Sequence, residues 1–121
     1  MSHPDQTKKA LSPHPILRLL ADFGNSHILN AAIEYDLFTY IHRGLHTFAE
    51  IARQAETDPR ATRIVLDGLI ALALVEKRAE KYFLCPISEA FLVKDKPSYM
   101  GDFRHVTLAL WDGMAHLKET L

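Results

Sequence analysis

The sequence predicts a mainly α-helical domain that carries one small β-hairpin. Three observations lead to this prediction. The first two are that apolar residues recur three or four positions apart through most of the chain, and that a charged stretch at residues 76–81 interrupts that spacing. A third observation is the length, because 121 residues form one domain with a core of ordinary size. We therefore expect a single domain of short helices interrupted by one hairpin.

The N-terminal part of the chain predicts an arm followed by two helices. Residues 1–14 are polar and contain prolines, so we expect a flexible arm, with ordered structure beginning at Ile16. Apolar spacing then predicts a short helix that ends near Gly24. A second helix is expected over residues 26–41, closed by Gly44.

Two capping signals mark the next helices. Thr47 and Glu50 have the spacing of a capping box, which satisfies two backbone donors and opens a short helix. Asp58 can cap the following helix, and Pro59 suits its first position. We expect that helix to run to about Leu74 and to be buried on several sides, because its apolar residues occupy more than one face.

The C-terminal part predicts the hairpin and two more helices. The charged stretch 76–81 and the apolar residues 82–85 indicate two short strands with a charged tip. Ser88 is expected to cap a short helix ending at Val93, and an apolar stripe predicts one long helix over residues 99–121. A helix-turn-helix followed by a hairpin is a winged-helix arrangement, which we take as the fold.

Composition and charge exclude several classes of protein. The chain is 48% hydrophobic and 24% charged, and its net charge of −1 does not favour nucleic acid. The longest apolar run, Leu69–Val75, is far shorter than the roughly 20 residues that cross a bilayer. The N-terminus lacks the apolar stretch of a secretory signal, so we expect a cytoplasmic protein that does not enter membranes.

No catalytic or metal-binding pattern stands out. The five glycines are isolated, so neither a GxGxxG nor a Walker pattern is present. His42 and His46 are separated by a helix-ending glycine, and His105 and His116 lie three turns apart on the last helix. We interpret the histidines as hydrogen-bonded or solvent-exposed groups, expect no metal, and interpret Cys85 as a structural thiol.

The winged-helix arrangement leaves DNA binding open as an alternative. The side chains that would reach DNA come from the second helix and the wing: Arg60, Thr62, Arg63, Lys77, Arg78 and Lys81. Acidic residues alternate with these basic ones, so the local surface is close to neutral and offers little attraction for phosphates. Nucleic acid is therefore not the favoured partner.

The last predicted helix carries candidate ligand contacts. Phe103, Trp111 and Met114, with His105 on the same helix, can line an apolar pocket. The same stripe can instead pack on neighbouring elements or across a subunit interface. Spacing alone leaves both interpretations open.

Five stretches of the chain follow a known family pattern: Glu34–Phe38, Thr47–Ala52, Leu66–Val75, Tyr82–Cys85 and Ser88–Leu92. Together they resemble the N-terminal dimerisation domain of S-adenosylmethionine-dependent O-methyltransferases, the class that includes plant phenolic and bacterial polyketide enzymes. Residues 111–121 resemble the helix that leads into the catalytic domain of these enzymes. Asp36 and Ala73 stand where the family has glycine, and Cys85 where it usually has threonine.

This resemblance implies a domain organisation and a partner. It implies a dimerisation domain over residues 15–98 and, over 99–121, a long helix leading toward a catalytic domain absent from this chain. The domain is expected to form an intertwined homodimer through the helices that begin at Ile28 and Tyr99. Apolar side chains of this domain would reach the pocket of a small-molecule hydroxyl acceptor. The candidates are Phe103, Trp111 and Met114.

The resemblance also locates the chemistry outside this chain. In the family, S-adenosylmethionine and the catalytic base, often a histidine, belong to a separate Rossmann-like domain. We therefore expect these 121 residues alone neither to bind the methyl donor nor to catalyse transfer. In the full enzyme a deprotonated hydroxyl would attack the donor methyl group. Two alternatives remain: a stand-alone winged-helix DNA-binding transcriptional regulator, and a degenerate dimerisation module without a catalytic partner.

Overall fold

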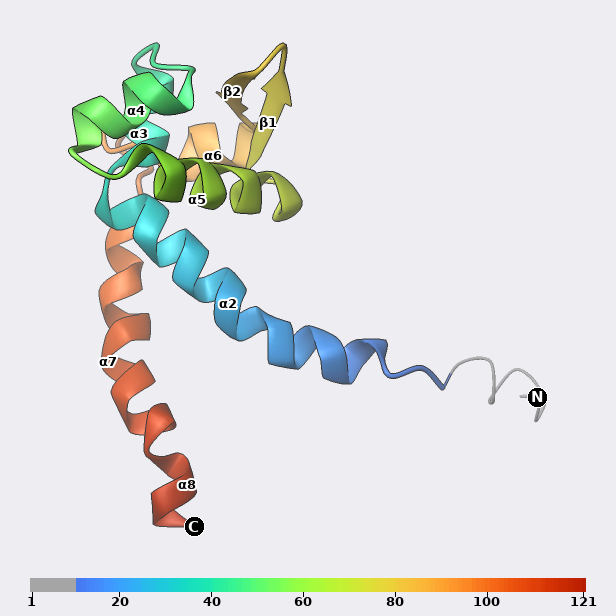
Figure 1. Ribbon diagram of the computed structural model, residues 1–121. Coiled ribbons are helices and arrows are strands. Elements are labelled where there is room, and N and C mark those ends of the chain that lie inside the picture. Colours follow the sequence, from blue (N-terminus) through green and yellow to red (C-terminus); the bar gives the residue numbers. More distant parts are fainter. Residues whose placement is uncertain (1–10) are drawn as a thin grey trace, which may run out of the picture.

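The computed structural model describes residues 11–121, apart from the side chain of Thr107, so most of the arm expected at 1–14 lies outside the described residues. It confirms a mainly α-helical domain with one two-stranded hairpin (Figure 1). The elements in chain order are α2 (His14–Glu34), α3 (Leu37–His42), α4 (Phe48–Ala55), α5 (Pro59–Ala71), β1 (Val75–Arg78), β2 (Lys81–Leu84), α6 (Pro86–Phe91), the 3₁₀ turn η1 (Gly101–Phe103), α7 (Arg104–Ala115) and α8 (Leu117–Thr120).

The first helix is longer than the sequence predicts. Helix α2 begins at His14, two residues before the expected start, and passes through Gly24 without interruption. The prediction of two helices meeting near Gly24 is therefore wrong. The chain turns instead at Asp36, whose φ of 59° is left-handed, and α3 follows at once. Aspartate tolerates this conformation better than most residues, which makes it a workable substitute for glycine.

The caps at Thr47 and Asp58 are confirmed, but of the reciprocal pair of bonds expected for a capping box the described residues show only the one to the Thr47 hydroxyl. The Thr47 hydroxyl accepts a hydrogen bond of 3.3 Å from the backbone N–H of Glu50, and the Asp58 carboxylate accepts one of 2.8 Å from the N–H of Ala61. Helices α4 and α5 begin directly after these caps. Side chains of this type at the cap satisfy backbone donors that a helix leaves unpaired in its first turn.

Helix α5 is shorter and less enclosed than expected. It ends at Ala71 rather than near Leu74, because Ala73 takes a left-handed φ of 59° and turns the chain into the hairpin. Its buried residues, Thr62, Leu66 and Leu69, lie on one face. Ile64 on the same helix is 65% exposed, so the expectation of a helix buried on several sides is wrong for this chain.

The hairpin is confirmed, with a tighter tip than the sequence indicates. Val75 pairs with Leu84 and Arg78 with Lys81, so most of the charged stretch lies in the strands. The tip is only Ala79 and Glu80, both at positive φ, as a two-residue hairpin turn requires.

The C-terminal elements correct two further predictions. Ser88 does not cap its helix: α6 begins at Pro86, and the buried Ser88 hydroxyl donates a hydrogen bond of 2.7 Å to the carbonyl of Leu74. The single helix expected over 99–121 is divided into η1, α7 and α8, with a break at His116. A hydroxyl can bond a carbonyl that is distant in sequence, which local capping rules do not anticipate.

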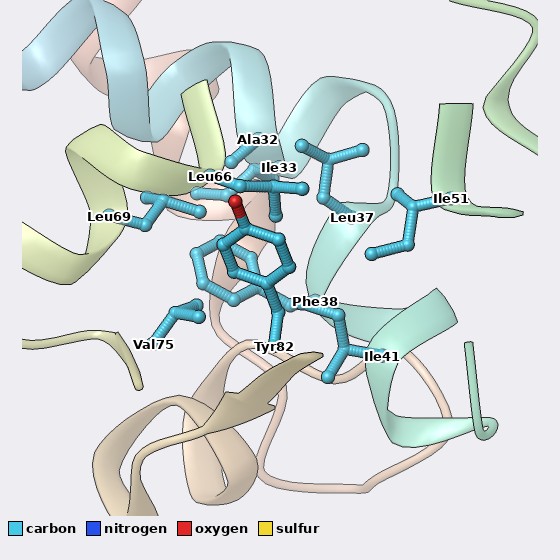
Figure 2. Close-up of a cluster of buried hydrophobic side chains, with 10 residues drawn as sticks. All are labelled: Ala32, Ile33, Leu37, Phe38, Ile41, Ile51, Leu66, Leu69, Val75 and Tyr82. Carbon is cyan, nitrogen blue, oxygen red and sulfur yellow. The ribbon is translucent and has the colours of Figure 1, made fainter. Parts of the chain in front are cut away.

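The core brings four helices, α2 to α5, and the hairpin together. Figure 2 shows the Tyr82 ring among the side chains of α2, α3 and α5. The cluster comprises Ala32, Ile33, Leu37, Phe38, Ile41, Ile51, Leu66, Leu69, Val75 and Tyr82. Helices α2 and α5 approach closely at Gly68, because a Cβ there would lie 2.9 Å from the Cδ1 of Ile28. Only the second half of α2 therefore belongs to the core.

Two helices extend away from this core. In Figure 1 the first half of α2 and the α7–α8 segment leave the globular part in different directions. Every residue from 11 to 24 is exposed. Among residues 11–121, none of the helices combines the length and the apolar character that crossing a bilayer requires.

Candidate functional site

A cavity of about 320 Å³ lies where α2, α6 and the start of α7 meet. Its walls are largely apolar, and the main contributors are Leu29, Ile33, Phe91, Leu92, Met100 and Phe103. Cavities of a few hundred Å³ with apolar walls and a few polar groups are typical of small-molecule sites. This cavity is therefore the candidate functional site.

Local structure explains how the two walls come together. The α2 wall consists of residues 26, 29, 30 and 33, which share one helical face because they are three or four positions apart. The opposite wall is held by the backbone N–H of Met100, which donates a hydrogen bond of 2.8 Å to the carbonyl of Phe91. The Ser98 hydroxyl also donates to the carbonyl of Ala90, so the segment before α7 is held against α6.

Three polar residues are among those that line the largely apolar wall: Ser26, Asn30 and Arg104. Arg104 is half-buried, and within the described part of the chain no carboxylate lies within 4.0 Å of its guanidinium. Ser26 and Asn30 make no side-chain hydrogen bond to another described residue. Since Arg104 is the one ionisable side chain among the described lining residues, the cavity can bind a molecule but offers no general base.

The three side chains predicted to line a pocket occupy different places. Phe103 lies in the cavity wall and is 64% exposed. Trp111 and Met114 are not in the wall, and Met114 is 66% exposed. Sequence reasoning missed Arg104, which directly follows Phe103, and the polar residues of α2, whose spacing on one face was the available signal.

Trp111 instead joins α7 to α2. Its ring centroid lies 5.0 Å from that of Phe23 and 4.9 Å from that of His27, and these two rings are 4.6 Å apart. Aromatic rings at such distances attract each other in edge-to-face or tilted arrangements. This aromatic cluster bridges α2 and α7 beyond the cavity, so it fixes the orientation of α7.

Large apolar side chains are exposed along the first half of α2. They are Ile16, Leu17, Leu19, Leu20 and Phe23, each more than half exposed. We call these five residues the α2 apolar strip. Helix α7 exposes Val106, Leu110 and Met114 as well. A cluster of this size on the surface of one chain marks a surface that another molecule covers.

The residues that would contact DNA are mostly engaged within the chain. Thr62 is buried, and its hydroxyl donates to the Asp58 carbonyl at 2.8 Å. The guanidinium of Arg78 lies 4.1 Å from the centroid of the Phe83 ring and 3.4 Å from the Glu76 carboxylate. Lys77 and Arg63 likewise have acidic neighbours within 4.0 Å, which leaves little free positive charge for phosphates.

Two of the histidines, His42 and His46, and the cysteine have structural surroundings. His42 Nδ1 lies 2.7 Å from a carboxylate oxygen of Glu89, and His46 Nδ1 donates to the carbonyl of Tyr82 at 2.8 Å. No group of three or more metal-ligating side chains occurs in the described part of the chain. Burial raises the pKa of the Cys85 thiol, and the Glu76 carboxylate adds to the rise, which disfavours the reactive thiolate.

Comparison with known proteins relates the chain to methyltransferases. Residues 17–94 match the family described as O-methyltransferase dimerisation domain. The chain is 35% identical over 111 residues to the tetracenomycin polyketide synthesis 8-O-methyl transferase TcmO of Streptomyces glaucescens, covering 90% of this chain and 33% of that protein. It is 29% identical over 86 residues to the N,N-dimethyltransferase OxyT of Streptomyces rimosus, covering 71% of this chain and 25% of that protein.

A solved structure has a similar fold over most of the chain. The structure of PigF with SAH matches with a TM-score of 0.80 and 27% sequence identity, covering 90% of this chain and 32% of that chain. The present chain thus spans about a third of the length of PigF and of TcmO.

Proposed function

The chain belongs to the O-methyltransferase dimerisation-domain family, and on that premise we propose that it pairs two copies of a small-molecule methyltransferase. In this proposal the dimerisation domain covers residues 15–98, and the segment 99–121 leads toward a catalytic domain. The longer protein would transfer a methyl group from S-adenosylmethionine to a hydroxyl group of a small molecule, in keeping with the name of TcmO.

The observation that carries the proposal is the α2 apolar strip. Leu19 and Leu20 are 73% and 71% exposed, although both belong to a helix whose second half is in the core. Removing apolar surface from water contributes about 25 cal/mol per Å², so covering five such side chains favours association strongly. Since this half of α2 projects from the core in Figure 1, a second copy that covers it would interlock with the first.

We place the contact on different residues from those the sequence favours. Ile28 packs against Gly68 inside the core, so the half of α2 that begins there is already covered. The exposed apolar side chains precede it in the α2 apolar strip and recur on α7. The proposed dimer surface therefore combines the first half of α2 with α7.

The methyl donor would bind outside the described residues. In doubly wound folds a nucleoside binds at the carboxyl ends of parallel strands, beside a glycine-rich turn. Residues 11–121 contain one antiparallel strand pair, and Gly44 is the one glycine among them with a positive φ. The described residues do not fit S-adenosylmethionine, and we assign the donor to the catalytic domain of the longer protein.

The acceptor pocket would receive side chains from this chain. Phe103 supports this part of the proposal because it borders the cavity, whereas Trp111 would act through the aromatic cluster that fixes α7. Met114 is exposed on α7 and would reach an acceptor held by another domain or subunit. These three remain the proposed acceptor contacts.

Dimerisation can be tested on this chain directly. We expect light scattering coupled to size-exclusion chromatography to give twice the mass of the chain. Leu20→Glu should give the monomer mass because it introduces a charge into the α2 apolar strip. The matched control Ile64→Glu changes an equally exposed residue on α5 and should remain dimeric.

Circular dichroism would show whether both variants keep their helices. A monomeric wild-type chain over a wide concentration range would overturn the proposal. If Leu20→Glu dimerises as well as the wild type, the dimer contact does not lie on the first half of α2.

A further inference from the structure

We propose that the cavity between α2, α6 and α7 binds an aromatic molecule that carries one anionic oxygen, and that Arg104 pairs with that anion. The inference rests on the proposed function only for the ligand's role as methyl acceptor. Binding itself depends on the cavity of this chain.

The first step of the argument is the shape and lining of the cavity. Its volume of about 320 Å³ accommodates a small molecule of a few fused or linked rings. Phe91 of α6 and Phe103 of the turn before α7 both line the cavity. Two phenyl rings favour an aromatic ligand, because rings gain from stacked or edge-to-face contact in addition to burial.

The second step is the charge of Arg104. A half-buried guanidinium beside apolar side chains loses part of its hydration, and no described carboxylate within 4.0 Å compensates for it. An anionic oxygen on the ligand would supply this missing partner. A guanidinium binds carboxylates and other oxyanions through paired N–H donors, which fixes orientation as well as affinity.

The third step concerns the opposite wall. Ser26 and Asn30 are four residues apart on α2, and both residues line the cavity. Each can donate and accept hydrogen bonds, and neither has a described side-chain partner. They suit a neutral oxygen of the same ligand, so one molecule would contact α2 through a neutral group and α7 through its anion.

A matched pair of fluorescent probes tests the proposal. The anion 1-anilinonaphthalene-8-sulfonate and the neutral N-phenyl-1-naphthylamine share their ring system and differ in the sulfonate. We expect the wild-type chain to bind the anionic probe in a one-to-one ratio. Energy transfer from Trp111, the single tryptophan, would report on proximity to α7.

Variants of the wall separate charge from shape. Arg104→Gln should lower the affinity for the anionic probe about tenfold or more, because a charge-assisted pair is lost. The affinity for the neutral probe should stay unchanged. Arg60→Gln, at an exposed arginine on α5, is the matched control and should affect neither probe. Ser26→Phe should weaken the binding of both probes, because the larger side chain fills the cavity.

Three outcomes would overturn the proposal. One is equal affinity of the anionic probe for Arg104→Gln and the wild type. Another is binding that Ser26→Phe does not reduce, which would place the probe on the exposed apolar strip. A third is binding by the monomeric Leu20→Glu variant but not by the dimer, which would mean that a second copy fills the cavity. Loss of probe binding with intact dimerisation would leave the proposed function standing.

Discussion

The hydroxyl of Tyr82 in β2 donates a hydrogen bond of 2.7 Å to the carboxylate of Asp67 in α5. The tyrosine is completely buried, whereas the Asp67 side chain is about half exposed. Figure 2 shows the Tyr82 ring among the core side chains. Burial raises the pKa of Tyr82, and the bond to Asp67 raises it further, so the hydroxyl keeps its proton. This contact, together with the Lys77–Asp67 ion pair of 3.8 Å, ties the hairpin to the helix that precedes it.

Removing the hydroxyl should therefore destabilise the fold. We expect Tyr82→Phe to lower the free energy of unfolding by about 1–2 kcal/mol, since a hydrogen bond to a charged acceptor is lost while the ring remains. Urea denaturation followed by circular dichroism measures the change. Tyr35→Phe is the matched control, because the Tyr35 side chain is exposed. Equal stability of Tyr82→Phe and the wild type would show that the bond contributes nothing.

Replacing Ala73 with glycine should stabilise the fold. Its φ of 59° places it in the left-handed region, where a Cβ costs roughly 1 kcal/mol. We expect Ala73→Gly to raise the free energy of unfolding by about 0.5–1 kcal/mol, and the exposed side chain makes no buried contact that would be lost. Ala61→Gly inside α5 should instead lower it by a similar amount. A loss of stability in Ala73→Gly would contradict the assigned backbone conformation.

The parts of the fold that sequence predicted are those that depend on neighbours in the chain. The cap at Thr47 and the start of α5 at Pro59 need only residues within one helical turn, and both are confirmed. Gly24 misled the prediction because a glycine ends a helix only where the chain adopts a positive φ, and here Asp36 does so. Ser88 failed as a cap because its partner, the Leu74 carbonyl, is fourteen residues away.

The candidate site was harder to predict than the fold. The stripe on the last helix drew attention to Phe103, which lies beside the cavity. The cavity itself exists because Met100 bonds to Phe91 and so brings α6 toward α7, a contact that no spacing pattern encodes. For Trp111 the spacing left lining a pocket and packing on a neighbouring element both open, and its ring packs against Phe23 of a helix almost ninety residues earlier.

Two leucine-sized residues on α5 should respond very differently to truncation. Leu66 is fully buried, so Leu66→Ala should lower the free energy of unfolding by about 2–5 kcal/mol through lost burial and the cavity left behind. Ile64 is 65% exposed, and Ile64→Ala should change it by less than about 0.5 kcal/mol. Denaturation of both variants measures the difference. A large effect at Ile64 would restore the prediction that α5 is buried on several sides.

Glu89 should make the protein sensitive to acid. One of its carboxylate oxygens lies 2.9 Å from the Lys96 amine and 2.7 Å from His42 Nδ1. The Lys96 hydrogen bond, followed by that from His42, lowers the pKa of Glu89 below its ordinary value of 4.5. A carboxyl group whose pKa is lower in the folded state stabilises the fold above its unfolded pKa and loses this contribution as the pH falls through its folded pKa.

We therefore expect the free energy of unfolding to fall as the pH drops from about 5 toward 3, and Glu89→Gln to reduce the slope. The slope should not vanish, because Arg43 also lowers the pKa of Asp95. Urea denaturation at several pH values measures both effects, with the exposed Glu50→Gln as control. If Glu89→Gln and the wild type lose stability in parallel over this range, the contacts with Lys96 and His42 do not stabilise the folded chain.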